Sequence, residues 1–340
     1  MRIRPFVKIA LAIGVSVMVS DGGPGGYRVA LQAGSSSQAA PVPEANDGPI
    51  SARSNAVVVE GAYAYFGSGK QLVIADVSSP GLVTELGRTA SLNDSVHDVA
   101  VAGGLAYVAA GKAGLRVIDV SVPANPVEVG AHLSRGSTQA VALRGSTAFV
   151  ADAWAGLRII DVSSPTAPVT LAIVRTEHAQ DVFVTKQHAF VADQEGGLRV
   201  IDVRVPARPE DLGWCSLPGD ANGVQVVGRY AYVAAGGAGL QVVDVSTPKA
   251  PVKVGAYDAL YARSLYVADN HAFVATERGG LWVIDVTNPA APAPITSFAA
   301  RGSANAVHVA NGFAYVAVAT TRASLWVFDV SNLGVPGLDD

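Results

Sequence analysis

Hydrophobic and polar positions alternate in short segments from Asn55 onward. In the unit that runs from His97 to His132, Val99 and Val101 alternate with small residues, and the paired glycines at 103–104 follow them. Apolar side chains at every second position indicate strands, whereas no segment shows the three- and four-residue spacing of an amphipathic helix. The unit therefore predicts four antiparallel strands that tight turns connect.

A string of the form Leu-x-[VI]-[IVAF]-Asp-Val marks the third strand of each unit. It contains, in order along the chain, Asp76, Asp119, Asp161, Asp202, Asp244, Asp285 and Asp329, at intervals of 43, 42, 41, 42, 41 and 44 residues. Periods of 40 to 45 residues with several short Val-rich strands are typical of propeller blades. The pattern predicts an all-β fold, a seven-bladed β-propeller of four-stranded antiparallel blades.

Each of these aspartates precedes a turn. A short carboxylate bonds nearby backbone amides in such turns, so a group present in every unit indicates a structural role rather than a catalytic one. A proline then opens the outermost strand of most units, where the missing N–H faces solvent. The prolines in question are Pro126, Pro168, Pro209, Pro251, Pro292 and Pro336.

The start of the chain resembles a secretory signal. Arg2, Arg4 and Lys8 come before or at the edge of an apolar run over 9–19, and these 11 residues are too few for the roughly 20 that cross a bilayer. We expect a signal-like segment over 1–20 and an exported, extracytoplasmic protein that is secreted, periplasmic or at the cell surface, with no spanning helix after that segment.

The remaining boundaries follow from composition and from the repeats. Residues 21–52 are rich in Gly, Ser and Pro and predict a linker, and residues 53–340 form the propeller. The seventh unit stops before its outer strand, which predicts that the N-terminal segment supplies one, either Tyr27–Gln32 or the stretch around Ile50.

Strings such as LRVIDVS (115–121), LRIIDVS (157–163) and LWVIDVT (281–287) resemble the LVIVD-repeat family over residues 55–336. The resemblance implies a β-propeller of bacterial or archaeal exported and cell-surface proteins, and it brings no catalytic residues. The first and last units depart from the pattern, with Val83 and Leu333 where a proline is expected. Terminal repeats commonly differ in this way.

Composition and charge narrow the function classes. A chain with 50% hydrophobic residues can bury a core, and 24 Lys and Arg against 28 Asp and Glu leave a net charge of −4. That balance argues against nucleic acid as a partner. Cys215 is the one cysteine, so an intramolecular disulfide is excluded. Nucleophile, phosphate-loop and metalloprotease motifs are missing, and we expect a monomer with no cofactor and no metal.

Candidate binding residues come from the loops on one face of the ring. The residue two positions before the first strand valine, or its equivalent, is polar in every unit: Asn55, His97, Gln139, Gln180, Asn222, Arg263 and Asn305. These side chains either satisfy loop backbone groups near the axis or form a ring of donors for an anionic or hydroxylated ligand.

The loops between second and third strands break the sevenfold symmetry. Asp152 and Trp154 lie in the third unit, Asp193 in the fourth and Glu277 in the sixth. Acids with an indole resemble a carbohydrate platform, because an aromatic face stacks on sugar C–H groups while carboxylates accept hydroxyl protons. Solvated loops are the plain alternative. Lys70, Lys112, Glu195, Arg278 and Arg322 share these loops.

The sequence thus favours a ligand-binding or protein-interaction module, whose partner is an unknown protein or carbohydrate. One alternative is an extracytoplasmic enzyme of the glycan lyase or hydrolase type that uses His97, His178, Tyr261 or Arg263. Another is a structural component of a cell-surface assembly. A compact group of Asp94, His97 and Asp98 offers oxygen and nitrogen atoms to a divalent cation, although its spacing alone is weak support.

Overall fold

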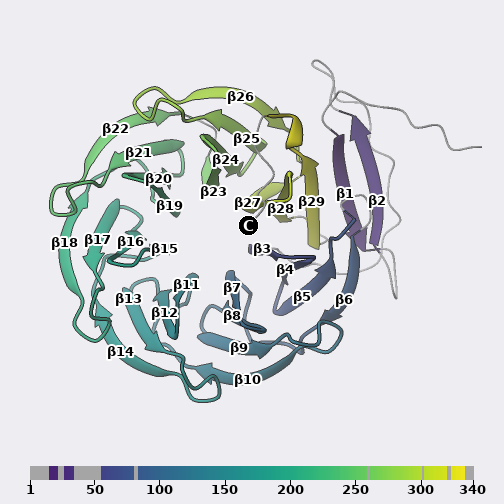
Figure 1. Ribbon diagram of the computed structural model, residues 1–340, viewed down its shortest axis with the longest axis horizontal. Helices are drawn as coiled ribbons and strands as arrows, with labels where there is room; N and C mark the ends of the chain where they lie inside the picture. The colour runs from purple at the N-terminus through teal and green to yellow at the C-terminus, as the bar shows by residue number, and fades with distance from the viewer. Residues whose placement is uncertain are drawn as a thin grey trace, which may run out of the picture.

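A computed structural model describes residues 15–21, 27–33, 55–79, 83–258, 261–300, 302–319 and 323–333. The described residues form a ring of seven blades around a central axis (Figure 1), so the predicted fold is confirmed. Within the described ranges, the one helical element is the 3₁₀ turn η1 (Ser331–Leu333). None of the described helices is long and apolar enough to span a membrane.

Each blade is an antiparallel sheet whose strands run outward from the axis in chain order. Blades 1 and 2 contain β3 (Val57–Glu60), β4 (Tyr63–Ser68), β5 (Gln71–Asp76) and β6 (Thr84–Arg88), then β7 (Asp98–Ala102), β8 (Leu105–Ala109), β9 (Leu115–Asp119) and β10 (Val127–His132). Blades 3 and 4 contain β11 (Ala140–Arg144), β12 (Thr147–Ala151), β13 (Leu157–Asp161) and β14 (Val169–Val174), then β15 (Asp181–Val184), β16 (His188–Ala192), β17 (Leu198–Asp202) and β18 (Glu210–Cys215). Blades 5 and 6 contain β19 (Gly223–Val227), β20 (Tyr230–Ala234), β21 (Leu240–Asp244) and β22 (Val252–Tyr257), then β23 (Ala262–Ala268), β24 (His271–Thr276), β25 (Gly280–Asp285) and β26 (Ala293–Phe298). Blade 7 contains β27 (Ser303–Ala310), β28 (Phe313–Ala319) and β29 (Ala323–Asp329).

The repeated aspartates sit at the turns that follow the third strands. In all seven units the carboxylate accepts a hydrogen bond from the backbone N–H two residues later, at 2.8–3.0 Å. This confirms the structural role predicted for them, because the carboxylate satisfies a turn amide that no strand partner reaches.

The hydrophobic core lies between the blades. The buried apolar residues of the described chain form seven clusters, and each cluster joins two neighbouring blades. In β9, Leu115, Val117 and Ile118 are fully buried, as expected of a strand that neighbouring blades cover on both faces. The ring is therefore held together by blade-to-blade packing, which fixes the loops relative to one another.

Blades also approach closely at their outer strands. Gly130 in β10 lies so near the turn of blade 3 that a Cβ atom there would be 2.1 Å from the Pro165 carbonyl oxygen. Gly87, Gly213 and Gly255 occupy the equivalent place in blades 1, 4 and 5 and meet the next blade in the same way. Glycine is needed here because backbone, not a flexible side chain, fills the space.

The outer edge of blade 7 is closed by strands from the N-terminal segment. β1 (Val15–Asp21) pairs with β29, and β2 (Tyr27–Ala33) pairs with β1 as a fifth strand. The sequence suggested Tyr27–Gln32 or the stretch around Ile50 as the closing strand. The first of these is wrong, because β1 and not β2 pairs with β29. Ile50 lies outside the described residues. Val15–Asp21 alternates Val with Ser or Met, a pattern that suits a strand as well as an apolar signal core.

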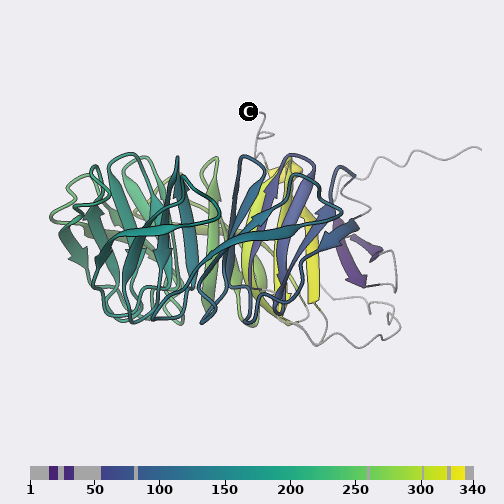
Figure 2. The same ribbon diagram turned by 90° about the horizontal axis from the view of Figure 1, so that it is seen from below.

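The disc has two loop-bearing faces (Figure 2). The mouth face carries the loops that precede the innermost strands and the loops between second and third strands. The turn face carries the remaining connections, including the aspartate turns. All the candidate binding residues belong to the mouth face.

Candidate functional site

Backbone bridges between neighbouring blades fix the mouth face. A residue in the loop between second and third strands pairs with a residue just before the next innermost strand, in four successive places: Gly111 with Thr138, Ala153 with Ala179, Gln194 with Ala221, and Gly236 with Ala262. The first partner of each pair has a positive φ, between 45° and 51°. These bridges hold the candidate side chains on a rigid frame.

The polar ring residues bond to the protein itself. Gln139 donates to Ser137, Gln180 bonds His178 at 2.7 Å, and Asn222 donates to the Ala262 carbonyl at 3.2 Å. Asn305 donates to the Asn55 side chain at 2.8 Å and joins blade 7 to blade 1. The His97 ring and the Asp94 carboxylate both lie against Gly111. The structure therefore places these residues on one face but supports the structural interpretation for most of them.

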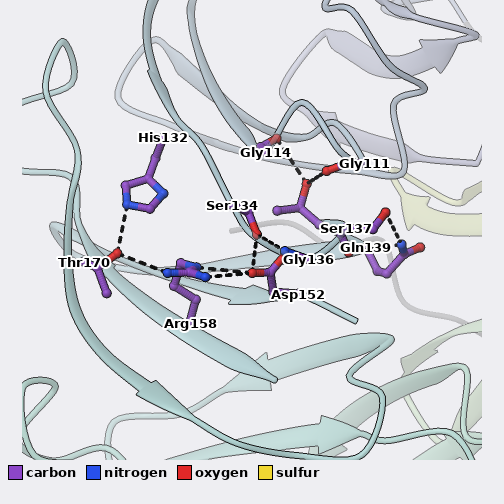
Figure 3. A network of polar contacts seen from close by, with 11 residues as sticks. Gly111, Gly114, His132, Ser134, Gly136, Ser137, Gln139, Asp152, Arg158 and Thr170 are labelled. Carbon is purple, nitrogen blue, oxygen red and sulfur yellow. Dashed lines mark hydrogen bonds and ion pairs between the residues drawn. The ribbon is translucent and has the colours of Figure 1, made fainter. Parts of the chain in front are cut away.

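Asp152 is buried, which removes it from the surface where the sequence placed a ligand site. Its carboxylate accepts hydrogen bonds from Ser134 and from Arg158, whose Nη2 lies 3.1 Å away (Figure 3). Arg158 in turn reaches Thr170, which bonds the His132 ring at 2.8 Å. The group is a polar network that links β10 of blade 2 to blade 3, and it ties the two mouth-face loops of blade 3 together.

Asp193 is the equivalent buried carboxylate in blade 4. It is fully buried, accepts the backbone N–H groups of Glu177 and His178 at 3.0 and 2.7 Å, and pairs with Arg199 at 3.3 Å. Burial of a carboxylate requires such partners, because a lone charge in the interior is costly. Asp152 and Asp193 are therefore buried partners of Arg158 and Arg199 in the mouth-face loops.

Blade 6 brings two predicted residues together. Arg263 falls at an irregularity in the pairing of β23 with β24, which leaves it outside the regular ladder. Its guanidinium lies 3.5 Å from the Glu277 carboxylate and 5.8 Å from the centre of the Tyr261 ring. The side chains of Arg263 and Glu277 are 41% and 33% exposed, so this pair stays open to solvent.

Trp154 is the most exposed aromatic side chain among the described residues. It follows Ala153 in the loop of blade 3 and is 63% exposed. The corresponding loops of blades 1, 2 and 4 carry the exposed charges Lys70, Lys112 and Glu195. Arg322 lies outside the described residues. The accessible part of the predicted site is therefore Trp154 with the Arg263 and Glu277 pair.

Two carboxylates near the axis were not among the predicted ligand-binding residues. Asp98 begins β7 and Asp181 begins β15, and each accepts the backbone N–H of the next blade's innermost strand, from Val141 and Val224. Burial raises the pKa of Asp98 to about 7, with a further contribution from the Asp181 charge, and burial raises the pKa of Asp181 to about 6. The sequence signals them as an acid directly after the polar residue of the ring, and blades 2 and 4 share this feature: Asp98 follows His97, and Asp181 follows Gln180.

The geometry gives little support to a metal site at Asp94, His97 and Asp98 or to an active site on this face. Asp94 accepts the Lys112 backbone N–H at 2.9 Å, while Asp98 accepts the backbone N–H of Val141 in blade 3. Burial lowers the pKa of His97, although nearby Asp94 opposes the shift. The described residues contain no group of three or more His, Cys, Asp or Glu placed to hold a metal ion. Of the four candidate catalytic residues, Tyr261 and Arg263 share blade 6, whereas His97 and His178 belong to blades 2 and 4.

A model of the LVIVD repeat matches the chain seven times, at residues 52–90, 94–133, 135–176, 177–215, 218–259, 261–299 and 301–339. The chain belongs to the LVIVD-repeat family. Each match covers one blade, so the family resemblance expected from the sequence is confirmed. A β-propeller built from these repeats fits a binding or interaction module.

Solved structures show the same fold at low sequence identity. The β-propeller domain of Cps50 (Swd1) from Myceliophthora thermophila is 13% identical, with a TM-score of 0.69, and the alignment covers 82% of this chain and 97% of that one. The computationally designed protein Ika8 is 10% identical, with a TM-score of 0.57 and the same coverage of both chains. A search of curated proteins finds no match. These likenesses concern the fold alone.

Proposed function

We propose that this LVIVD-repeat propeller is a binding module whose mouth face contacts a macromolecular partner. Trp154 carries the proposal. An exposed tryptophan on a rigid loop is the residue type that most often dominates the energy of protein interfaces, and here it packs into no core cluster of the described chain. The bridge between Ala153 and Ala179 fixes the loop beside it, which limits the entropy lost on binding.

Blade 6 supplies a second contact region on the same face. Tyr261 is 39% exposed and Arg263 is 41% exposed, and both residue types are enriched at binding hot spots. The ion pair between Arg263 and Glu277 holds the guanidinium in place without burying it. A polymer laid over the mouth could touch blades 3 and 6 together, and either a protein or a glycan fits such a pair of aromatic contacts.

Export is part of the proposal. Arg2, Arg4 and Lys8 with the apolar run at 9–19 support a secretory signal, and the family resemblance implies exported proteins. The apolar run overlaps β1, so removal of residues 1–20 would also remove the strand that pairs with β29. Mass spectrometry of the protein from fractionated cells would give both its location and its first residue.

Substitution of two comparably exposed tryptophans tests the binding proposal. Trp154 lies on the mouth face and Trp214 on the outer strand β18, and they are 63% and 59% exposed. Proteins and glycans cross-linked to the chain in the cells that produce it are quantified for the wild type, Trp154→Ala and Trp214→Ala. We expect Trp154→Ala to lose a specific partner that Trp214→Ala retains. Equal partner profiles for all three would refute the mouth-face proposal.

A further inference from the structure

The charges of the mouth face are separated between two sets of blades. The exposed basic side chains of blades 1 to 3 are Lys70, Lys112 and Arg135. The acidic side chains of the loops from blade 4 to the start of blade 6 are Glu177, Glu195, Asp220 and Asp258, of which Asp220 is half-buried and the others are exposed. The described mouth face thus has a basic part and an acidic part.

The remaining charged residues of this face do not cancel the separation. Asp152 and Asp193 are buried with Arg158 and Arg199, so they contribute little net charge to the surface. Asp94 accepts backbone N–H groups from its own blade. Arg175 is exposed where blade 3 leads into blade 4, two residues before Glu177, so it offsets part of the acidic charge at the border. Blade 6 is mixed, with Arg263, Glu277 and Arg278.

Trp154 lies at the border between the two parts. Its neighbour Ala153 pairs with Ala179, which leads into blade 4, so the loop that carries Trp154 lies where blade 3 meets blade 4. In a ring of seven blades, a line through the border of blades 3 and 4 crosses the axis and passes through blade 7 (Figure 1). This line divides the basic blades 1 to 3 from blades 4 to 6.

A two-fold rotation about that line places each part over its opposite. Blade 3 then faces blade 4 of the other copy, blade 2 faces blade 5, and blade 1 faces blade 6. Arg135 would oppose Glu195 and Glu177, Lys112 would oppose Asp220, and the two Trp154 side chains would meet near the rotation axis. A patch that is complementary to itself under a two-fold rotation is what a symmetric dimer requires.

We propose that a second copy of this chain docks mouth face to mouth face across this two-fold axis. The inference rests on the proposed function, because it names the partner of the same surface, and it departs from the monomer expected from sequence. The opposed charges set the orientation, and the two indoles supply an apolar contact on the two-fold axis where blades 3 and 4 meet. Salt weakens the association because the charges lie at the surface.

Sedimentation velocity on the purified chain tests the dimer directly. Between about 1 and about 100 µM, we expect the weight-average sedimentation coefficient to rise from monomer to dimer. The rise should be smaller at about 500 mM salt than at about 50 mM salt, because screening shortens the reach of the charges. Trp154→Ala should weaken the dimer at least about tenfold, equivalent to about 1.4 kcal/mol, while Trp214→Ala on the outer strand should leave it unchanged.

A charge exchange tests the orientation. Arg135→Glu and Glu195→Lys should each weaken the dimer several-fold, because each variant brings like charges together across the interface. The double variant should form a tighter dimer than either single variant, since the pair between positions 135 and 195 is restored with its signs exchanged while Glu177 is unchanged. Both residues are exposed, and the melting temperature of each variant verifies that it folds.

The outcomes separate the inference from the proposed function. A chain that stays monomeric at low salt, or a double variant that is weaker than both single variants, overturns the face-to-face dimer. If a monomeric chain still loses a different partner on Trp154→Ala, the mouth face remains a binding surface. If Trp154→Ala changes neither self-association nor cross-linked partners, both proposals fail.

Discussion

The carboxylate of Asp98 in blade 2 accepts a hydrogen bond at 2.9 Å from the backbone N–H of Val141 in blade 3. Asp181 in blade 4 makes the same contact with Val224 in blade 5 at 2.8 Å. The innermost strands have no strand partner toward the axis, so these side chains satisfy edge amides that would otherwise rely on water. The contact places two carboxylates in a desolvated setting where each ionises with difficulty.

Asp98→Asn should therefore stabilise the propeller at neutral and alkaline pH. The pKa of Asp98 is raised to about 7, above its ordinary value, so the folded state binds more protons than the unfolded state between about pH 4 and pH 7. The stability from this group is complete at low pH and declines as the pH rises through that window. Asn keeps an acceptor for Val141 without the charge, and we expect a gain of about 1–3 kcal/mol at pH 8 by urea unfolding.

The same experiment at pH 4 provides the control, because the carboxyl is then largely protonated and the gain should shrink. Asp181→Asn should also lower the pKa of Asp98, since the Asp181 charge contributes to that shift. A gain from Asp98→Asn that is equal at pH 4 and pH 8 would contradict the ionisation argument.

Asp152→Ala should destabilise the chain, because it leaves the Arg158 guanidinium buried without its carboxylate. The Arg158 side chain is only 9% exposed, and loss of one partner of a buried pair costs about 3–5 kcal/mol. The double variant Asp152→Ala/Arg158→Met should recover part of that loss, because neither charge remains. Urea unfolding checks both variants, and a single variant as stable as wild type would return Asp152 to the list of candidate ligand-binding residues.

The sequence predicts the repeated features of this molecule well and the singular ones poorly. The strands, the blade number and the turn role of Asp119 and its equivalents follow from a pattern that recurs seven times. The pairing of Asp152 with Arg158 needs the register of β12 and β13, which composition does not give. A comparison of the units does hint at this pairing. Blades 3 and 4 carry both an Asp after the second strand and an Arg in the third strand. Blade 2 has Ala110 at the Asp position, and its Arg116 pairs instead with Glu128.

Gly130→Ala should destabilise the boundary between blades 2 and 3. The added Cβ would stand 2.1 Å from the Pro165 carbonyl oxygen, so the turn of blade 3 must shift, at a cost of about 1–3 kcal/mol. Gly237→Ala is the matched control, because a Cβ there meets nothing within 4 Å and its φ is not positive. Melting temperatures decide the question, and equal values for the two variants would show that the outer strands are less tightly packed than the structure indicates.

Removal of residues 1–21 should open the outer edge of blade 7. β1 pairs with β29 through Ser16–Val19 against Leu325–Phe328, and it is the link between β29 and β2. Without β1, the outward backbone groups of β29 lose their partners, and an unpaired edge exchanges its amide hydrogens faster. We expect a lower melting temperature and faster hydrogen exchange confined to β29, with β13 and β17 unchanged as internal references.

Removal of residues 1–33 separates two ways in which the edge could respond. If β2 moves inward to pair with β29 in the shorter deletion, only the longer deletion will lose protection at Leu325–Phe328. If both deletions lose it equally, β1 alone closes the ring and an exported form cut near residue 20 has an open blade 7. Unchanged exchange in both deletions would contradict closure by the N-terminal strands, because β29 would then be protected by something else.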